Sequence, residues 1–228
     1  DALKSNTTGG TNIAVGWKAL ELNQIGDSNT VVGNASMMKN ISGFQNSAYG
    51  DVVLRENIDG IQNAAFGTNA LLANINGNHN SAFGVGSLTG NNSGSFNTAF
   101  GYFAMSNLTA GDNNLAIGNQ VQVPNSTGSD QMNIANEIYG LDLTNMASGK
   151  IGIGTTTPSA KLHIAPSNTF APNSTDGIII PRVNNFPTPN PTAAQQSMLI
   201  YLTAQFGANI AGFYYWDNPT LSWKGIDN

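Results

Sequence analysis

Cysteine is missing from this chain of 228 residues, and charged residues make up only 9% of it. Without cysteine, disulfides and thiolate metal sites are excluded. Eight Lys and Arg residues against 13 Asp and Glu give a net charge of −5, and the basic residues are spread from Lys4 to Lys224. Nucleic-acid binding requires clustered positive charge, so no nucleic-acid partner is expected. Since no run of 18 apolar residues occurs, we also expect no insertion of this segment into a membrane.

Residues that carry out catalysis are also scarce. The only two histidines, His79 and His163, lie in different parts of the chain, which leaves almost no material for a Ser/His/Asp triad. Glu56 and Asp59 are close together, but the other repeats of the chain have no counterparts to them. No phosphate loop of the Walker type is present, and the Gly-Ile-Gly at 152–154 lacks the third glycine of a dinucleotide fingerprint. We therefore expect no enzyme activity, no cofactor and no metal ion.

What the chain does contain is a motif, Asn-x-small-apolar-Gly, which occurs seven times with a constant step of 17 residues. Its asparagines are Asn12, Asn29, Asn46, Asn63, Asn80, Asn97 and Asn114. Its glycines are Gly16, Gly33, Gly50, Gly67, Gly84, Gly101 and Gly118. A second glycine series, from Gly9 to Gly111, has the same period. A fixed short period is typical of repeat architectures, in which each unit buries its apolar face only against its neighbours.

One repeat has the length of one coil of a parallel β-solenoid with two short strands and two turns. Seventeen residues are too few for two helices, and Gly and Asn at fixed offsets suit turns with positive φ. Because side chains alternate along a strand, Ala65 shares a face with Asn63, whereas Phe66 points the other way. A Leu or Met follows four residues after each of the first six glycines, as Leu71 follows Gly67, and Gln122 breaks the series after Gly118. We expect one apolar column to fill the coil and another to pack against neighbouring subunits.

The asparagines are predicted to have a structural role. Stacked amides one rung apart, about 4.8 Å, form hydrogen-bonded ladders along a stack of strands. A further asparagine falls seven residues after the glycine in five of the six full repeats, and Leu108 is the exception. Ladder or turn positions explain both series better than catalysis does.

The form Asn-(Ser/Thr)-Ala-(Phe/Tyr)-Gly, found at 46–50, 80–84 and 97–101, resembles the head repeats of trimeric autotransporter adhesins. It is also similar to repeats in tail fibres of bacterial viruses. The resemblance covers residues 9–118 and implies a homotrimer of left-handed parallel β-rolls. Hexapeptide acyltransferases, calcium-binding repeats and ice-binding solenoids fit less well, because the chain lacks their repeated positions.

Beyond residue 118 the period is lost. Residues 150–164, Lys-Ile-Gly-Ile-Gly-Thr-Thr-Thr-Pro-Ser-Ala-Lys-Leu-His-Ile, resemble a junction segment of phage tail fibres and related bacterial fibre proteins. We predict an all-β chain of four parts: a β-solenoid over 1–118, a β-rich neck over 119–164, a Pro-rich connector over 165–196 and a small C-terminal β-module over 197–228.

The C-terminal module is predicted to contain a β-hairpin, with strands on either side of a turn at Asp217-Asn-Pro-Thr220. Alternation places Tyr214 and Trp216 on one face of the first strand and Phe213 and Tyr215 on the other. One face is expected to be core or subunit interface, and the other a platform on which a ligand stacks. The candidate ligand-binding residues are Tyr214, Trp216, Asp217, Asn218 and Trp223.

These patterns predict a structural and adhesive fibre, located outside the cell, that assembles as a parallel homotrimer and attaches to a cell-surface glycan or protein receptor. The first hypothesis is an adhesin of a bacterial surface. The alternative is a tail fibre or receptor-binding protein of a bacterial virus or a contractile injection system. The chain begins at Asp1 rather than at a methionine, which is typical of a processed form or a fragment.

Overall fold

The computed structural model describes residues 1–145, 147–166, 178–188, 190–192, 195–205 and 209–226. The chain divides into two units, Asp1–Ser167 and Asn168–Asn228. The described residues are all-β without an α-helix, as the sequence predicts, and no segment among them forms a helix with the length and hydrophobicity that crossing a bilayer requires. Residues 167–177 of the predicted connector lie outside the described residues.

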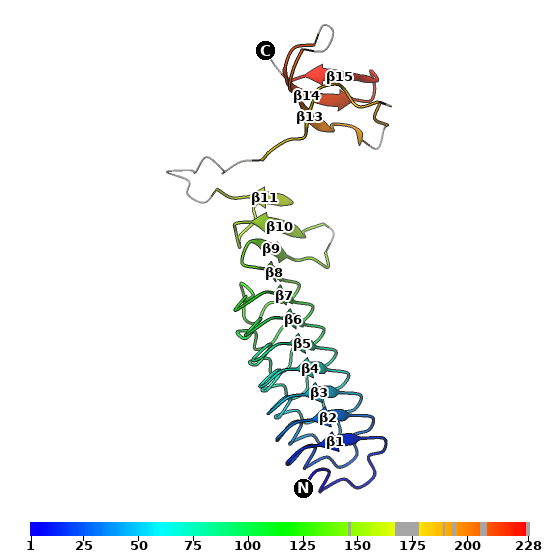
Figure 1. Ribbon diagram of the computed structural model, residues 1–228, viewed down its shortest axis with the longest axis vertical. Helices are drawn as coiled ribbons and strands as arrows, with labels where there is room; N and C mark the ends of the chain where they lie inside the picture. Colours follow the sequence, from blue (N-terminus) through cyan, green and yellow to red (C-terminus); the bar gives the residue numbers. More distant parts are fainter. Residues whose placement is uncertain (146, 167–177, 189, 193–194, 206–208, 227–228) are drawn as a thin grey trace. The chain divides into compact units, whose positions relative to one another are not determined.

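The first unit is built on short strands that stack one above the next (Figure 1). Within the seven repeats, each strand pairs in parallel with its successor and each strand residue lies opposite the residue 17 positions later, as Ala48 lies opposite Ala65. The predicted parallel β-solenoid is therefore confirmed, and one sequence repeat is one coil. The repeat strands are β1 (Ile13–Val15), β2 (Thr30–Val32), β3 (Ser47–Tyr49), β4 (Ala64–Phe66), β5 (Ser81–Phe83), β6 (Thr98–Phe100) and β7 (Leu115–Ile117).

The parallel stack continues for one strand beyond the glycine series and then reverses. Strand β8 (Met132–Ile134) still pairs in parallel with β7, whereas β9 (Ile138–Leu141) is antiparallel to β8. The chain reverses through Ala135 and Asn136, whose φ angles of 56° and 60° suit the tight turn of a hairpin. The sheet ends with β10 (Lys150–Ile153) and β11 (Leu162–Ile164), which pair in parallel.

The interior of the coil contains the Leu/Met column and the small residues at the centre of each strand. We call the former the inner column: all of its members are fully buried. They are Leu20, Met37, Leu54, Leu71, Leu88 and Met105. Full burial of such a side chain stabilises the fold by about 1.5–3 kcal/mol. The alanines at the strand centres, such as Ala65 and Ala82, are also fully buried and leave room for the inner column within a thin coil.

Positive φ angles occur in every coil, at the expected motif glycines and also at residues for which the sequence does not predict them. The motif glycines have them, with Gly33 at 146°, but the motif asparagines do not. Instead the inner column adopts the left-handed region, as Leu71 does with φ of 50°. This conformation costs about 1–2 kcal/mol for a residue with a Cβ atom. Burial of the side chain offsets that cost, and so does the hydrogen bond that the Leu71 N–H donates to the Ser87 carbonyl oxygen at 3.0 Å.

The motif asparagines form a continuous ladder inside the coil. The Oδ1 atom of Asn63 accepts hydrogen bonds from the backbone N–H of Asn80 at 3.0 Å and from its Nδ2 at 3.1 Å. The Nδ2 of Asn63 donates to the Oδ1 of Asn46 at 3.1 Å and to the carbonyl oxygen of Gly77 at 2.9 Å. The pattern repeats from Asn12 to Asn114, and Gln131 continues it by donating to the Oδ1 of Asn114. The ladder thus satisfies buried polar groups along the whole stack.

A second ladder runs parallel to the first through Asn6, Asn23, Asn40, Asn57, Asn74 and Asn91. It ends at Leu108, which is fully buried at the next position of this column. The Oδ1 of Asn91 is accordingly buried without a hydrogen-bond partner in the described part of the chain. A break in the sequence pattern thus leaves one unsatisfied acceptor.

We expect Asn63→Ala to lower the free energy of unfolding by about 2–4 kcal/mol, because it removes four side-chain hydrogen bonds and leaves the buried N–H of Asn80 without an acceptor. Chemical denaturation of the full chain measures the effect. Asn76→Ala is the matched control, since Asn76 is exposed on the same coil. Equal losses in the two variants would contradict a stabilising ladder.

The second unit contains a four-stranded sheet in the order β12-β13-β14-β15. Its strands are β12 (Arg182–Val183), β13 (Leu199–Leu202), β14 (Gly212–Asp217) and β15 (Ser222–Gly225). Strands β14 and β15 form the predicted hairpin, in which Trp216 lies opposite Trp223. One face of the sheet carries a small core of Ile200, Leu202 and Tyr214, against which Phe186 and Trp223 pack.

Candidate assembly and binding surfaces

The residue that precedes the glycine in each motif points outward, and these residues form what we call the outer column. Alternation along the strand places it opposite the buried alanine, so it lies on the surface of the coil. Its members are Val15, Val32, Tyr49, Phe66, Phe83, Phe100 and Ile117. Phe100 is 59% exposed and Val15 57% exposed, and no member is buried within the single chain.

Aromatic rings of the outer column stack on one another at the spacing of the strands. The ring centroids of Tyr49 and Phe66 are 4.9 Å apart, as are those of Phe66 and Phe83, and the planes are within 8° of parallel. Phe83 and Phe100 follow at 6.0 Å with a tilt of 32°. Parallel in-register pairing places equivalent positions of successive repeats above one another. The repeat therefore produces a continuous apolar stripe.

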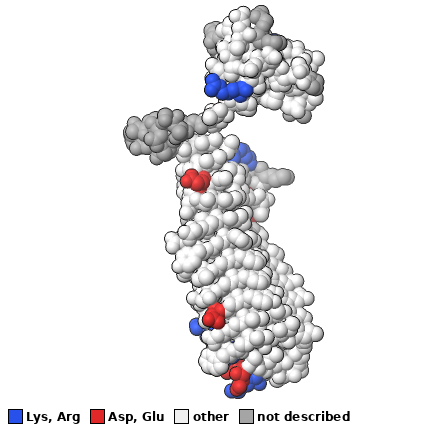
Figure 2. Space-filling model, viewed as in Figure 1, with Lys and Arg blue, Asp and Glu red and all other residues white. Residues whose placement is uncertain are grey.

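Charged side chains are sparse over much of the coil. The sequence has no Lys or Arg between Arg55 and Lys150, and Figure 2 shows few charged side chains on the viewed face of the coil. A contiguous apolar surface with little surrounding charge is characteristic of a surface that another protein covers.

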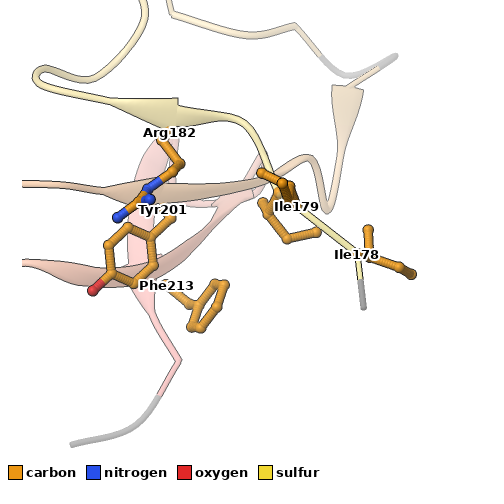
Figure 3. A pocket seen from close by; sticks show the side chains of 6 residues that line it. Ile178, Ile179, Arg182, Tyr201 and Phe213 are labelled. Atoms are coloured by element: carbon orange, nitrogen blue, oxygen red, sulfur yellow. The ribbon is translucent and has the colours of Figure 1, made fainter. Parts of the chain in front are cut away.

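A second apolar surface lies on the C-terminal unit, on the face of the sheet that carries Phe213. A groove of about 260 Å³ is lined there by Ile178, Ile179, Ile180, Arg182, Tyr201 and Phe213, which we call the isoleucine groove (Figure 3). Ile179 is 88% exposed. The guanidinium carbon of Arg182 lies 5.5 Å from the centre of the Tyr201 ring, a cation–π contact that orders the polar side of the groove. The sequence predicts only a Pro-rich connector over 165–196 and gives no sign of this exposure.

The residues proposed from the sequence as ligand contacts fall into two groups. Trp216 is fully buried and Tyr214 nearly so, with the Tyr214 hydroxyl donating to the Ile210 carbonyl oxygen at 2.9 Å. Their shared face is therefore the core face of the sheet. Asp217, Asn218 and Trp223 are partly exposed, and the carboxylate of Asp217 accepts a hydrogen bond from Thr220 within the hairpin turn. Ligand binding by these residues stays a prediction.

Titratable groups gather at one place on the coil surface. The Lys39 ammonium donates to Glu56 Oε2 at 2.5 Å, and this bond, more than the Arg55 contact at 2.8 Å, lowers the pKa of the Glu56 carboxyl; partial burial opposes the shift. Both ion pairs are surface contacts and contribute little to stability. No group of three His, Cys, Asp or Glu side chains suited to a metal ion occurs among the described residues.

The C-terminal part of the chain carries a recognisable family pattern, which takes in the end of the first unit and all of the second. Residues 152–228 match the family model of the phage tail like trimerisation region. The match supports the resemblance to trimeric tail-fibre segments of phages. The trimerisation region includes the whole isoleucine groove, whereas the outer column precedes it. No curated protein and no solved structure gave a match to the chain.

Proposed function

We propose that this chain is a non-enzymatic segment of a homotrimeric fibre, in which three parallel copies pack along the outer column and through the C-terminal unit. The observation that carries the proposal is the unbroken outer column of apolar side chains, which one chain leaves uncovered. The match to a phage tail like trimerisation region supports three as the number of copies.

A second copy of the same chain fits the outer column better than an unrelated protein does. The column repeats at the strand spacing over seven rungs, and an identical parallel copy offers the same spacing in register. Burial of each Phe or Tyr contributes about 1.5–3 kcal/mol, and the contribution recurs at every rung. Closed cyclic symmetry then buries all copies of the column about one axis.

As for the biological role, we propose a tail fibre or receptor-binding fibre of a bacterial virus or contractile injection system that attaches to the surface of a target cell. The description of the matching family supports this role. The second candidate is a bacterial surface adhesin, which the resemblance of the repeats at 46–50, 80–84 and 97–101 to adhesin heads favours. Both roles place the fibre outside the cell.

The assembly is tested with Phe83→Asp. Three carboxylates buried side by side without partners are strongly unfavourable, so we expect the trimer to dissociate at protein concentrations about 100-fold higher than the wild type does. Light scattering distinguishes the trimer from the 23.8 kDa chain.

Ile75→Asp serves as the control for this variant. Ile75 is also an exposed apolar residue of the coil, but it lies outside the outer column, so its replacement should leave the trimer intact. A wild-type protein that is a folded monomer at micromolar concentration would refute the proposed fibre. Equal effects of the two variants would refute the outer column as the interface.

A further inference from the structure

The C-terminal unit contains a second cavity, separate from the isoleucine groove, of about 440 Å³. It lies between the segment that follows β12 and the hairpin of β14 and β15, and we call it the indole pocket. Its aromatic lining consists of Phe186, Trp216 and Trp223. Its size is within the range of pockets that bind small ligands, about 300–1,000 Å³.

The aromatic side chains of the indole pocket are fixed by one another. Trp216 and Trp223 are directly opposite across the hairpin, with ring centroids 5.7 Å apart and planes at 63°. The Phe186 ring stacks on Trp223 at 5.4 Å, with planes 11° apart. Trp223 is partly exposed, so part of its indole is accessible at the cavity.

The indole N–H groups of the two tryptophans are enclosed by the protein rather than open to the pocket. The indole Nε1 atoms of Trp216 and Trp223 are both buried and have no hydrogen-bond partner in the described part of the chain. Trp216 itself is 0% exposed. A buried indole N–H normally has an acceptor, and leaving one without a partner costs about 1–3 kcal/mol. Because both nitrogen atoms are inaccessible to solvent, any ligand contacts at the pocket come from its other groups.

Apart from Pro187 and Leu221, the rest of the described lining is polar and uncharged. It includes the amides of Asn185, Asn190 and Asn209 and the hydroxyls of Thr188 and Ser222, and no Lys, Arg, Asp or Glu. An ionic ligand would find no counter-charge. Amides both donate and accept hydrogen bonds, which suits a ligand that carries many hydroxyl groups.

We propose that the indole pocket binds a neutral carbohydrate unit, a monosaccharide or disaccharide of a cell-surface glycan. The apolar face of the sugar ring packs against the accessible part of Trp223, and its hydroxyl groups pair with Asn185 and Asn190. The site deepens the attachment role proposed above and rests on it, since it gives the fibre a class of receptor. Three copies per fibre would raise a weak affinity through multivalency.

The test uses intrinsic fluorescence of the full chain in its assembled form. The chain has three tryptophans, and Trp17→Phe leaves only Trp216 and Trp223, both in the pocket, as reporters. The probes are galactose, glucose, N-acetylglucosamine and lactose, with sialic acid as an anionic control. We expect at least one neutral sugar to shift the emission saturably and sialic acid to have no effect.

Matched variants then locate the binding. In the Trp17→Phe background, Asn190→Ala should weaken the affinity for the active sugar about five- to tenfold. Asn76→Ala should leave the affinity unchanged, because Asn76 is an exposed asparagine of the solenoid and is not part of the pocket lining. No response to any neutral sugar would overturn the proposal, and so would an affinity that Asn190→Ala does not change. Light scattering on the same samples tests the fibre separately, since the pocket lies within one chain and a monomer that binds sugar would refute only the trimer.

Discussion

Gly33→Ala is expected to lower the free energy of unfolding by more than about 4 kcal/mol, the largest loss from any single methyl group in the coil. Gly33 has a φ of 146°, a conformation that residues with a Cβ atom rarely adopt. The added Cβ would overlap the carbonyl oxygen of Gly50 on the next rung and lie 2.6 Å from its carbonyl carbon. Both atoms belong to the backbone, which is held in the parallel sheet, so the clash is relieved only by separating two rungs.

Circular dichroism during thermal unfolding of the full chain measures this effect. Gly10→Ala is the control, because Gly10 belongs to the first coil, has no positive φ, and would bring its Cβ no closer than 3.4 Å to Asp27 Oδ1. We expect the control to retain the wild-type melting temperature within a few degrees. A Gly33→Ala protein with the same melting temperature as the control would contradict the close approach of the two rungs.

Trp216→Ala should unfold the C-terminal sheet, with a loss of about 3–5 kcal/mol that exceeds what so small a core can tolerate. Trp216 is fully buried, and it lies directly opposite Trp223 across the hairpin. Hydrogen exchange of the full chain follows the backbone amides of β13, β14 and β15 selectively. We expect their protection to be lost while the amides of the solenoid keep theirs.

Phe213→Ala is the matched variant on the opposite face of β14. Phe213 is 46% exposed, and its replacement should change the protection of the sheet by less than about 1 kcal/mol. A Trp216→Ala protein with an intact sheet that no longer attaches to cells would instead support Trp216 as a ligand contact and contradict its role as core.

The coil was predictable from the sequence because the repeat length of 17 residues determines most of its contacts. A step of 17 residues places Ala48 opposite Ala65 and Asn63 opposite Asn80, so ladders and columns follow from the repeat alone. The inner and outer columns follow in part from strand alternation. Hydrogen bonds that link each rung to the rung before it and the rung after it then make local preferences secondary.

The parts that sequence reasoning missed are those in which tertiary contacts override local preference. Nothing in the propensity of Leu71 indicates a left-handed φ, which the coil imposes through backbone hydrogen bonds to its neighbours. Gln131 replaces an asparagine in the ladder because its longer amide still reaches Asn114 Oδ1, at 3.2 Å. The reversal after β8 uses Ala135, a residue that does not mark a turn.

The candidate sites were predicted less completely for a similar reason. Alternation along β14 correctly separates Tyr214 and Trp216 from Phe213, but alternation alone does not say which face is the core. The segment that follows β12 decides this, because Phe186 packs on the face that carries Tyr214. The exposure of Ile179 follows in the same way from the fold of a separate segment, for which the sequence has no periodic signal.

Because every coil pairs with its neighbours without insertions, the number of coils determines the length of the solenoid. A coil contacts only the coil before it and the coil after it, through the same ladders and the same glycines at every step. Duplication of the corresponding 51 nucleotides in the gene, three for each of the 17 residues, therefore inserts a coil that its neighbours already accommodate. Each duplication lengthens the solenoid by about 4.8 Å, so unequal recombination between repeats adjusts the reach of the fibre without new packing having to evolve.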